Sequence, residues 1–137
     1  MGEVYEVEDL TVVQTVALKT IRADIARDAG QVERFRRELL ISRNLAHRNL
    51  CKVFHYDEID RANGDRLRFY TMELLHGETL AQRIGRDGRL SEETALNILD
   101  EIAAGLSEVH RNGIIHRDLK PAIVFSSRST ATQNVPS

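Results

Sequence analysis

The chain has 137 residues, 42% of them hydrophobic and 29% charged, which is the composition of a single globular domain. Its net charge of −2 gives no electrostatic reason to expect nucleic acid or an anionic membrane as a partner. With no apolar run near the ~18 residues that span a bilayer, no signal peptide and one cysteine, the composition predicts a cytoplasmic protein.

The first part of the chain carries the signals of strand, strand, helix, strand and strand. Residues 2–9 and 14–21 have β-branched, partly alternating patterns typical of two strands. Residues 31–45 place apolar side chains at helical spacing on one face. Residues 51–59 and 66–75 flank Asn63-Gly64, a pair that supplies the positive φ angles of a hairpin turn. These elements predict a small antiparallel sheet with one helix packed on it, and Cys51 is expected to be a small buried residue.

Helical patterns dominate the rest of the chain. Residues 77–85 predict a short helix, closed by glycines at 85 and 88. Residues 91–113 give the clearest helix, with Ser91 as N-cap and Asn112-Gly113 as its end. Its apolar stripe consists of Ala95, Leu99, Ile102, Leu106 and Val109.

Two motifs have residue types suited to nucleotide binding. Lys19 ends VALK on the second predicted strand, where its ammonium can reach phosphates if Glu38, on the predicted helix, holds it in place. TMELLHGE follows the hairpin as an extended segment whose backbone can pair with an adenine edge. Each signal alone also has an ordinary explanation. Lys19 and Glu38 fit a strand lysine beside an exposed helix glutamate, and TMELLHGE fits an ordinary edge strand.

The motif HRDLKP, residues 116–121, is more specific because it follows the long helix. Asp118 can accept the proton of a substrate hydroxyl, and Lys120 can steady a transferring phosphoryl group. With the three motifs in this order, residues 2–124 resemble the protein kinase superfamily, and in detail its bacterial-type serine/threonine members.

The resemblance implies an α+β fold in which residues 1–75 are a kinase small lobe, lacking its first strand and first loop glycines. Residues 76–125 would begin the large lobe, up to the catalytic loop, and residues 126–137 would be a disordered tail. ATP and Mg²⁺ are the implied cofactors, and a protein of unknown identity is the implied substrate.

The resemblance also implies a role for each residue that matches the family motifs. Asp118 would be the catalytic base, and Lys120 the lysine that marks serine/threonine kinases. The nucleotide-binding positions would be the loop glycine Gly2, the adenine-covering Val4 and Ala17, the phosphate-binding Lys19 with its ion-pair partner Glu38, the gatekeeper Met72, the hinge residues Glu73 and Leu75, and Glu78 near the ribose.

The sequence departs from the family pattern at the metal ligands. Ile123 stands where the family has a metal-binding asparagine, as if that residue were deleted from P-A-N-I-V, and no D-F-G follows Phe125. We therefore expect no metal site, and no useful phosphoryl transfer by this chain alone, because the reaction depends on positioned charge.

Three hypotheses remain open at this level. The chain is an inactive fragment of a serine/threonine kinase, a catalytically dead module that docks on a full-length kinase, or an unstable fragment without function. Because the later helices that cover it in the family are absent from this sequence, we expect Leu99, Ile102, Leu106 and Val109 to form an exposed apolar face that promotes self-association.

Overall fold

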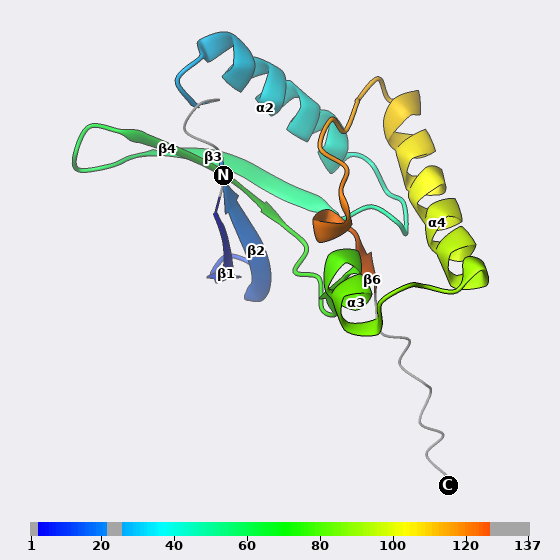
Figure 1. The fold of residues 1–137 in the computed structure, drawn as a ribbon. Coiled ribbons are helices and arrows are strands. Elements are labelled where there is room, and N and C mark those ends of the chain that lie inside the picture. The colour runs from blue at the N-terminus through cyan, green and yellow to red at the C-terminus, as the bar shows by residue number, and fades with distance from the viewer. Residues whose placement is uncertain (1–2, 22–25, 127–137) are drawn as a thin grey trace, which may run out of the picture.

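The computed structural model describes residues 3–21 and 26–126, which form a twisted sheet with helices beside and beyond it (Figure 1). The sheet is antiparallel with strand order β1-β2-β4-β3. Its strands are β1 (Val4–Asp9), β2 (Gln14–Thr20), β3 (Val53–Asp60) and β4 (Arg66–Met72). The helices are α2 (Ala29–Arg43), α3 (Leu80–Asp87) and α4 (Glu92–Arg111), and two short strands, β5 (Glu78–Thr79) and β6 (Phe125–Ser126), pair with each other. The predicted α+β class is confirmed.

The β1–β2 turn closes without the usual turn residues. The Asp9 side chain accepts the backbone N–H of Thr11 at 2.9 Å and of Val12 at 3.4 Å. Val13 has a φ of 52°, a left-handed conformation that β-branched residues rarely adopt. An aspartate that bonds the backbone two residues on thus replaces the glycine or asparagine that makes such turns recognisable in a sequence.

The helix α2 packs on the sheet through the face that its sequence predicts. Asp28 caps its start by accepting the N–H groups of Gly30 and Gln31 at 2.9 and 3.1 Å. Val32 and Leu39 are buried. The ring of Phe35 lies 5.8 Å from that of Tyr70 in β4, which fixes the helix over this part of the sheet.

Two expected boundaries differ from the structure. Helix α3 runs through Gly85 and ends at Gly88, where φ is 73°. Near the end of the described residues, a 3-10 turn (Pro121–Ile123) precedes the short strand β6. Ser126 belongs to that strand and not to a tail, and residues 127–137 lie outside the described residues.

The apolar stripe of α4 is only partly exposed. Leu99 is 59% exposed, as predicted, and the neighbouring Leu96 is 53% exposed. Ile102 and Leu106 are half-buried. The prediction was wrong for Val109, which is 9% exposed and buried together with Ile114, because the chain turns back on the helix just after α4.

Gly105 lets α4 lie directly against the loop that precedes β3. A Cβ at this position would lie 3.2 Å from the Asn49 carbonyl oxygen and 3.3 Å from Leu50 Cδ2. The Asn49 amide in turn donates to the carbonyl of Glu101 in α4 at 2.9 Å, which holds the loop in place. The close approach therefore depends on the absence of a side chain.

We predict that Gly105→Val lowers the free energy of unfolding by about 1–3 kcal/mol, because the added methyl groups force α4 away from the loop. Gly85→Val is the matched control: its added Cβ meets no atom within 4 Å, so the change should stay within about 0.5 kcal/mol. Urea unfolding followed by circular dichroism measures both. Equal effects of the two substitutions would contradict the close packing at Gly105.

Candidate functional site

Four of the expected nucleotide-binding residues lie on one face of the sheet. The strand register sets Val4 opposite Lys19 and Ala17 opposite Met72. Residues that are directly opposite, or two apart in one strand, share a face. Tyr70 is opposite Lys19 and contacts Phe35 of α2, so this is the face that α2 partly covers. Gly2 lies outside the described residues.

The segment after β4 offers a backbone edge for hydrogen bonding. The N–H of Glu73 donates to the carbonyl of Lys52 at 2.8 Å, and the Cys51 thiol lies 3.5 Å from the Glu73 carbonyl. Within the described part of the chain, the backbone N–H and C=O of Leu75 make no hydrogen bond. A backbone pair of this kind needs a partner, which a ligand can supply.

Cys51 is an exposed residue, although the sequence favoured a buried one. Partial burial of its sulfur raises the pKa of the thiol to about 11, and the charge of Glu73 acts in the same direction. Cys51 is therefore a thiol, and not a thiolate, near neutral pH.

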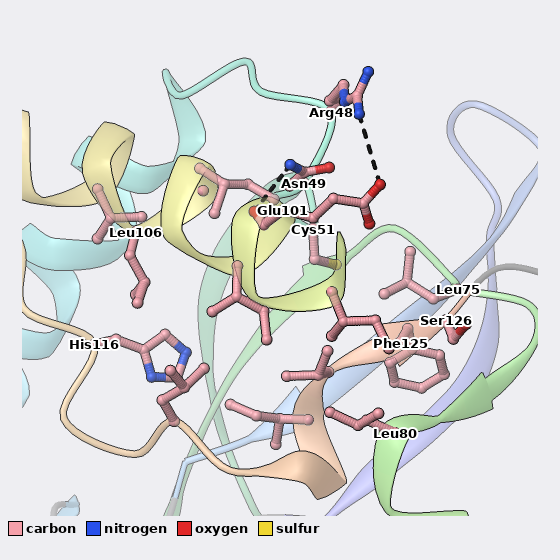
Figure 2. Close-up of a pocket in the computed structure, with 18 of the residues that line it drawn as sticks. Arg48, Asn49, Cys51, Leu75, Leu80, Glu101, Leu106, His116, Phe125 and Ser126 are labelled. Carbon is pink, nitrogen blue, oxygen red and sulfur yellow. Dashed lines mark hydrogen bonds and ion pairs between the residues drawn. The ribbon is translucent and has the colours of Figure 1, made fainter. Parts of the chain in front are cut away.

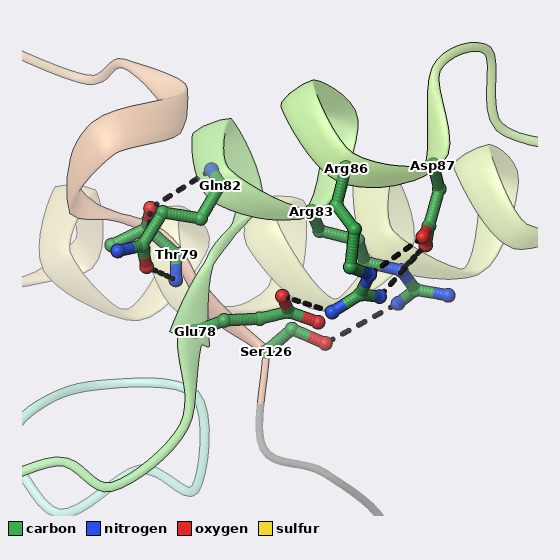
Figure 3. A network of polar contacts seen from close by, with 7 residues as sticks. All are labelled: Glu78, Thr79, Gln82, Arg83, Arg86, Asp87 and Ser126. Carbon is green, nitrogen blue, oxygen red and sulfur yellow. Dashed lines mark hydrogen bonds and ion pairs between the residues drawn. The ribbon is translucent and has the colours of Figure 1, made fainter.

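Glu78 is engaged by the side chain of Arg86 (Figure 3). Its carboxylate accepts a hydrogen bond from Arg86, which also donates to Asp87 at 2.7 and 2.8 Å. Arg83 donates to the Ser126 hydroxyl at 3.3 Å. The hydrogen bonds from Arg86 lower the pKa of Asp87. The network ties α3 to β5 and β6, and the expected ribose contact of Glu78 stays a prediction.

The two catalytic-loop candidates contact each other. The Lys120 ammonium lies 3.1 and 3.3 Å from the two carboxylate oxygens of Asp118. This hydrogen bond is the main reason why the pKa of Asp118 is lowered, and the charges of Lys120, His116 and Lys19 act in the same direction.

Glu38 pairs with the catalytic loop and not with the sheet. Its carboxylate lies 3.4 Å from a guanidinium nitrogen of Arg117. Among the residues that the structure describes, Lys19 and Glu38 form no ion pair, so the expected pair is wrong for this structure. The sequence pattern identified both residues but not the competing cation, which comes from a loop far along the chain.

A pocket of about 640 Å³ lies between α4, the segment after β4 and the catalytic loop (Figure 2). Glu73 and Leu75 line it, but Val4, Ala17, Lys19 and Met72 do not. Its walls include Ile98, Ile102, Leu106, Leu119 and Phe125. The sequence did not predict this pocket, because it forms between segments whose relative placement no local pattern specifies.

The described residues do not fit a bound magnesium ion. No group of three histidine, cysteine or acidic side chains in residues 3–21 and 26–126 is placed to hold a metal. Asp118 is already neutralised by Lys120, and Ile123 lines the pocket with an apolar side chain. Oxygen ligands, which Mg²⁺ requires, are therefore not assembled here.

The protein kinase domain family matches residues 1–133, so the chain belongs to the protein kinase family. It is 38% identical over 125 residues to the probable serine/threonine-protein kinase CE0033 of Corynebacterium efficiens, covering 91% of this chain and 19% of that protein. It is 36% identical over 133 residues to the serine/threonine-protein kinase PknB of Mycolicibacterium smegmatis, covering 97% of this chain and 21% of that protein. The chain thus spans about a fifth of the length of these relatives.

Solved structures of the same family share the fold. The PknI kinase domain of Mycobacterium tuberculosis matches with a TM-score of 0.77 at 29% identity. The match covers 89% of this chain and 48% of that one. This similarity confirms that the described residues form the first part of a kinase domain. That part consists of the antiparallel sheet with α2 and the helices that follow the sheet in the chain. None of the helices in the described ranges is both long and apolar enough to cross a bilayer.

We predict that Lys120→Met raises the pKa of Asp118 toward the ordinary value of about 3.9, because the hydrogen bond and the adjacent charge are lost. A carbon-detected NMR titration of the Asp118 carboxyl measures this. A carboxyl group whose pKa is lower in the folded state than in the unfolded state stabilises the fold at pH values above its unfolded-state pKa. This stabilisation is lost as the pH falls through the folded-state pKa. Lys120→Met should therefore differ from the wild type in stability above about pH 4, and the difference should vanish in stronger acid. Lys52→Met is the control, and an unchanged Asp118 pKa in Lys120→Met would refute the assignment.

Proposed function

We propose that this chain binds an adenine nucleotide such as ATP on the sheet face formed by Val4, Ala17, Lys19 and Met72. The observation that carries the proposal is the strand register, which gathers three apolar side chains and one lysine on the same face. The unpaired backbone of Leu75 would hydrogen-bond the adenine edge. The activity to which this site belongs is that of a serine/threonine protein kinase, with a protein hydroxyl as the acceptor.

The electrostatics of the site favour a polyphosphate. In the described part of the structure Lys19 has no carboxylate paired with it, so its charge is available to an anionic ligand. Lys120 would supply a second ammonium, although it is shared with Asp118. Because Mg²⁺ does not fit the residues present, we propose that these lysines, and no protein-held metal, balance the charge of the phosphates.

Phosphoryl transfer by this chain alone is not part of the proposal. Asp118 is ionised and therefore able to accept a proton, but the family reaction also needs positioned metal charge. Self-association and docking on a full-length kinase both stay predictions. Leu96 and Leu99 of α4, each more than half exposed, are the side chains that such a contact would cover.

We predict that Lys19→Met weakens ATP and ADP binding by about 10-fold or more and leaves adenosine binding unchanged, since a charge-assisted hydrogen bond contributes ~1.5–3 kcal/mol. Isothermal titration calorimetry measures all three ligands, with Lys52→Met as the matched lysine control. Replacing Mg²⁺ by EDTA should not weaken ATP binding to the wild type. The proposal fails if wild-type protein binds none of the ligands, or if loss of Lys19 affects adenosine as strongly as ATP.

We also predict that the purified chain transfers no radiolabelled phosphate from Mg-ATP to a generic basic protein. The physical reason is that metal ligands are not assembled around Asp118 and Ile123 in the described residues. Asp118→Asn supplies the background for the assay. Label incorporation by the wild type that disappears in Asp118→Asn would show that the described residues suffice for catalysis.

A further inference from the structure

The outer edge of strand β6 carries backbone groups without a partner. In the pairing of β6 with β5, Phe125 lies opposite Thr79. The N–H of Leu80, one residue further along, donates to the carbonyl of Val124 at 2.7 Å. Because hydrogen-bonded and non-hydrogen-bonded pairs alternate along an antiparallel ladder, Phe125 and Thr79 form a non-hydrogen-bonded pair. The N–H and C=O of Phe125 therefore point away from β5, and no described residue hydrogen-bonds to them.

This open edge borders the pocket between α4, the segment after β4 and the catalytic loop (Figure 2). Val124, Phe125 and Ser126 line the pocket, whereas Glu78 and Thr79 of β5 do not. The strand pair thus presents β6, and not β5, to the pocket.

Another wall of the pocket is apolar. Ile98, Ile102 and Leu106 follow one another at helical spacing on α4, and all three line the pocket. The fold buries each of them only in part, so some of their apolar surface is available to another apolar group. Arg48 is already paired with Glu101 at 3.6 Å, so this charge does not select the occupant.

We propose that the pocket binds an extended strand of another polypeptide, which pairs with the edge of β6 and places aliphatic side chains beside α4. The unpaired backbone of Phe125 needs a donor and an acceptor from one extended residue. The apolar wall needs aliphatic side chains, and side chains on one face of a strand recur at every second residue. A strand with alternating aliphatic residues has both properties, and strand addition at an open edge is a general mode of peptide recognition. This partner is independent of nucleotide binding.

Two occupants from the chain itself are less suitable. Residues 127–137 follow β6 directly, but they contain one large aliphatic residue, Val135, and cannot supply alternating aliphatic side chains. A second copy would have to offer β1 or β3, the edge strands of the four-stranded sheet. Each of these strands carries three acidic residues, and charged residues on an edge strand oppose further pairing.

Isothermal titration calorimetry of the full chain with the synthetic peptide Lys-Ile-Thr-Ile-Thr-Ile-Lys tests the proposal. We expect saturable binding, and binding about 5-fold or more weaker when the same residues are arranged as Lys-Ile-Ile-Thr-Thr-Ile-Lys, because the alternation is broken. No binding of the alternating peptide, or equal binding of the two peptides, would overturn the proposal.

Backbone methylation of the peptide tests the strand pairing without changing the protein. One peptide carries N-methyl groups on its isoleucines, and another carries them on its threonines. Since successive N–H groups of a strand point to opposite edges, only one of these peptides loses the N–H that faces β6. That peptide should bind about 5-fold or more weakly, and the other should bind like the unmodified peptide. Equal effects of the two modifications would show that the peptide does not pair with an edge.

A matched pair of substitutions on α4 locates the peptide. Ile102→Ser removes an aliphatic side chain from the pocket wall and should weaken binding by about 10-fold. Leu99→Ser, at an exposed position outside the pocket, should change the affinity by less than about 2-fold. Circular dichroism checks that both variants fold, and the methylated peptides decide the question if Ile102→Ser does not. Equal affinities of the two variants would place the peptide elsewhere and overturn the proposal.

Hydrogen exchange followed by NMR reports on the edge of β6 itself. The Phe125 amide should exchange freely in the dilute chain and at least about 10-fold more slowly with the alternating peptide. The Leu80 amide, already bonded to Val124, is the internal reference. Protection of Phe125 in the free chain at every concentration would assign the edge to residues 127–137. Protection that grows with protein concentration would assign it to a second copy, and either result would overturn the proposal.

Discussion

The pairing of β2 with β1 on one side and with β4 on the other is the constraint on which the site depends. Its register alone places Val4 across from Lys19, and Ala17 across from Met72. A shift of one residue in either pairing would turn these side chains to opposite faces of the sheet. Ala17, only 3% exposed, lies at the buried centre of the sheet. The sheet face that we propose binds a nucleotide is thus a consequence of backbone hydrogen bonding before any charge is considered.

The charges of the site are organised around shared partners. Asp118 and Glu38 are the acidic groups, and Lys19, Lys120 and Arg117 are the basic ones. Because the arrangement brings three cations to two carboxylates, one positive charge remains for a ligand, and among the described residues of the site it is that of Lys19. Which cation remains unpaired depends on which ion pairs form, and exposed ion pairs exchange partners at a small free-energy cost.

Local patterns predicted the elements well because each one has its own signal. Asp28 and Ser91 cap their helices, and Gly64 closes the β3–β4 hairpin with a φ of 83°, although Asn63 does not share the positive φ expected of the pair. The predictions that failed concern contacts between distant segments, or turns that form without the usual turn residues. Val13 adopts a turn conformation that its residue type disfavours, and Val109 is buried by a segment that follows its helix. The family motifs located Lys19 and Glu38, but Glu38 pairs with Arg117, which lies much later in the sequence.

At Ile123 the backbone of the catalytic loop is retained, whereas the side chain expected to bind a metal is not. The N–H of Ile123 donates to the Lys120 carbonyl at 3.0 Å, so the turn after the catalytic motif forms although the expected asparagine is missing. What is lost is the side chain: an alkyl group, which lines the pocket, stands where the family motif has a metal-binding asparagine. The backbone geometry of the catalytic loop can therefore persist without the metal-binding side chain, because the backbone depends on strand and turn hydrogen bonds and metal binding depends on individual side chains. For this reason our proposal treats nucleotide binding and phosphoryl transfer as separate properties.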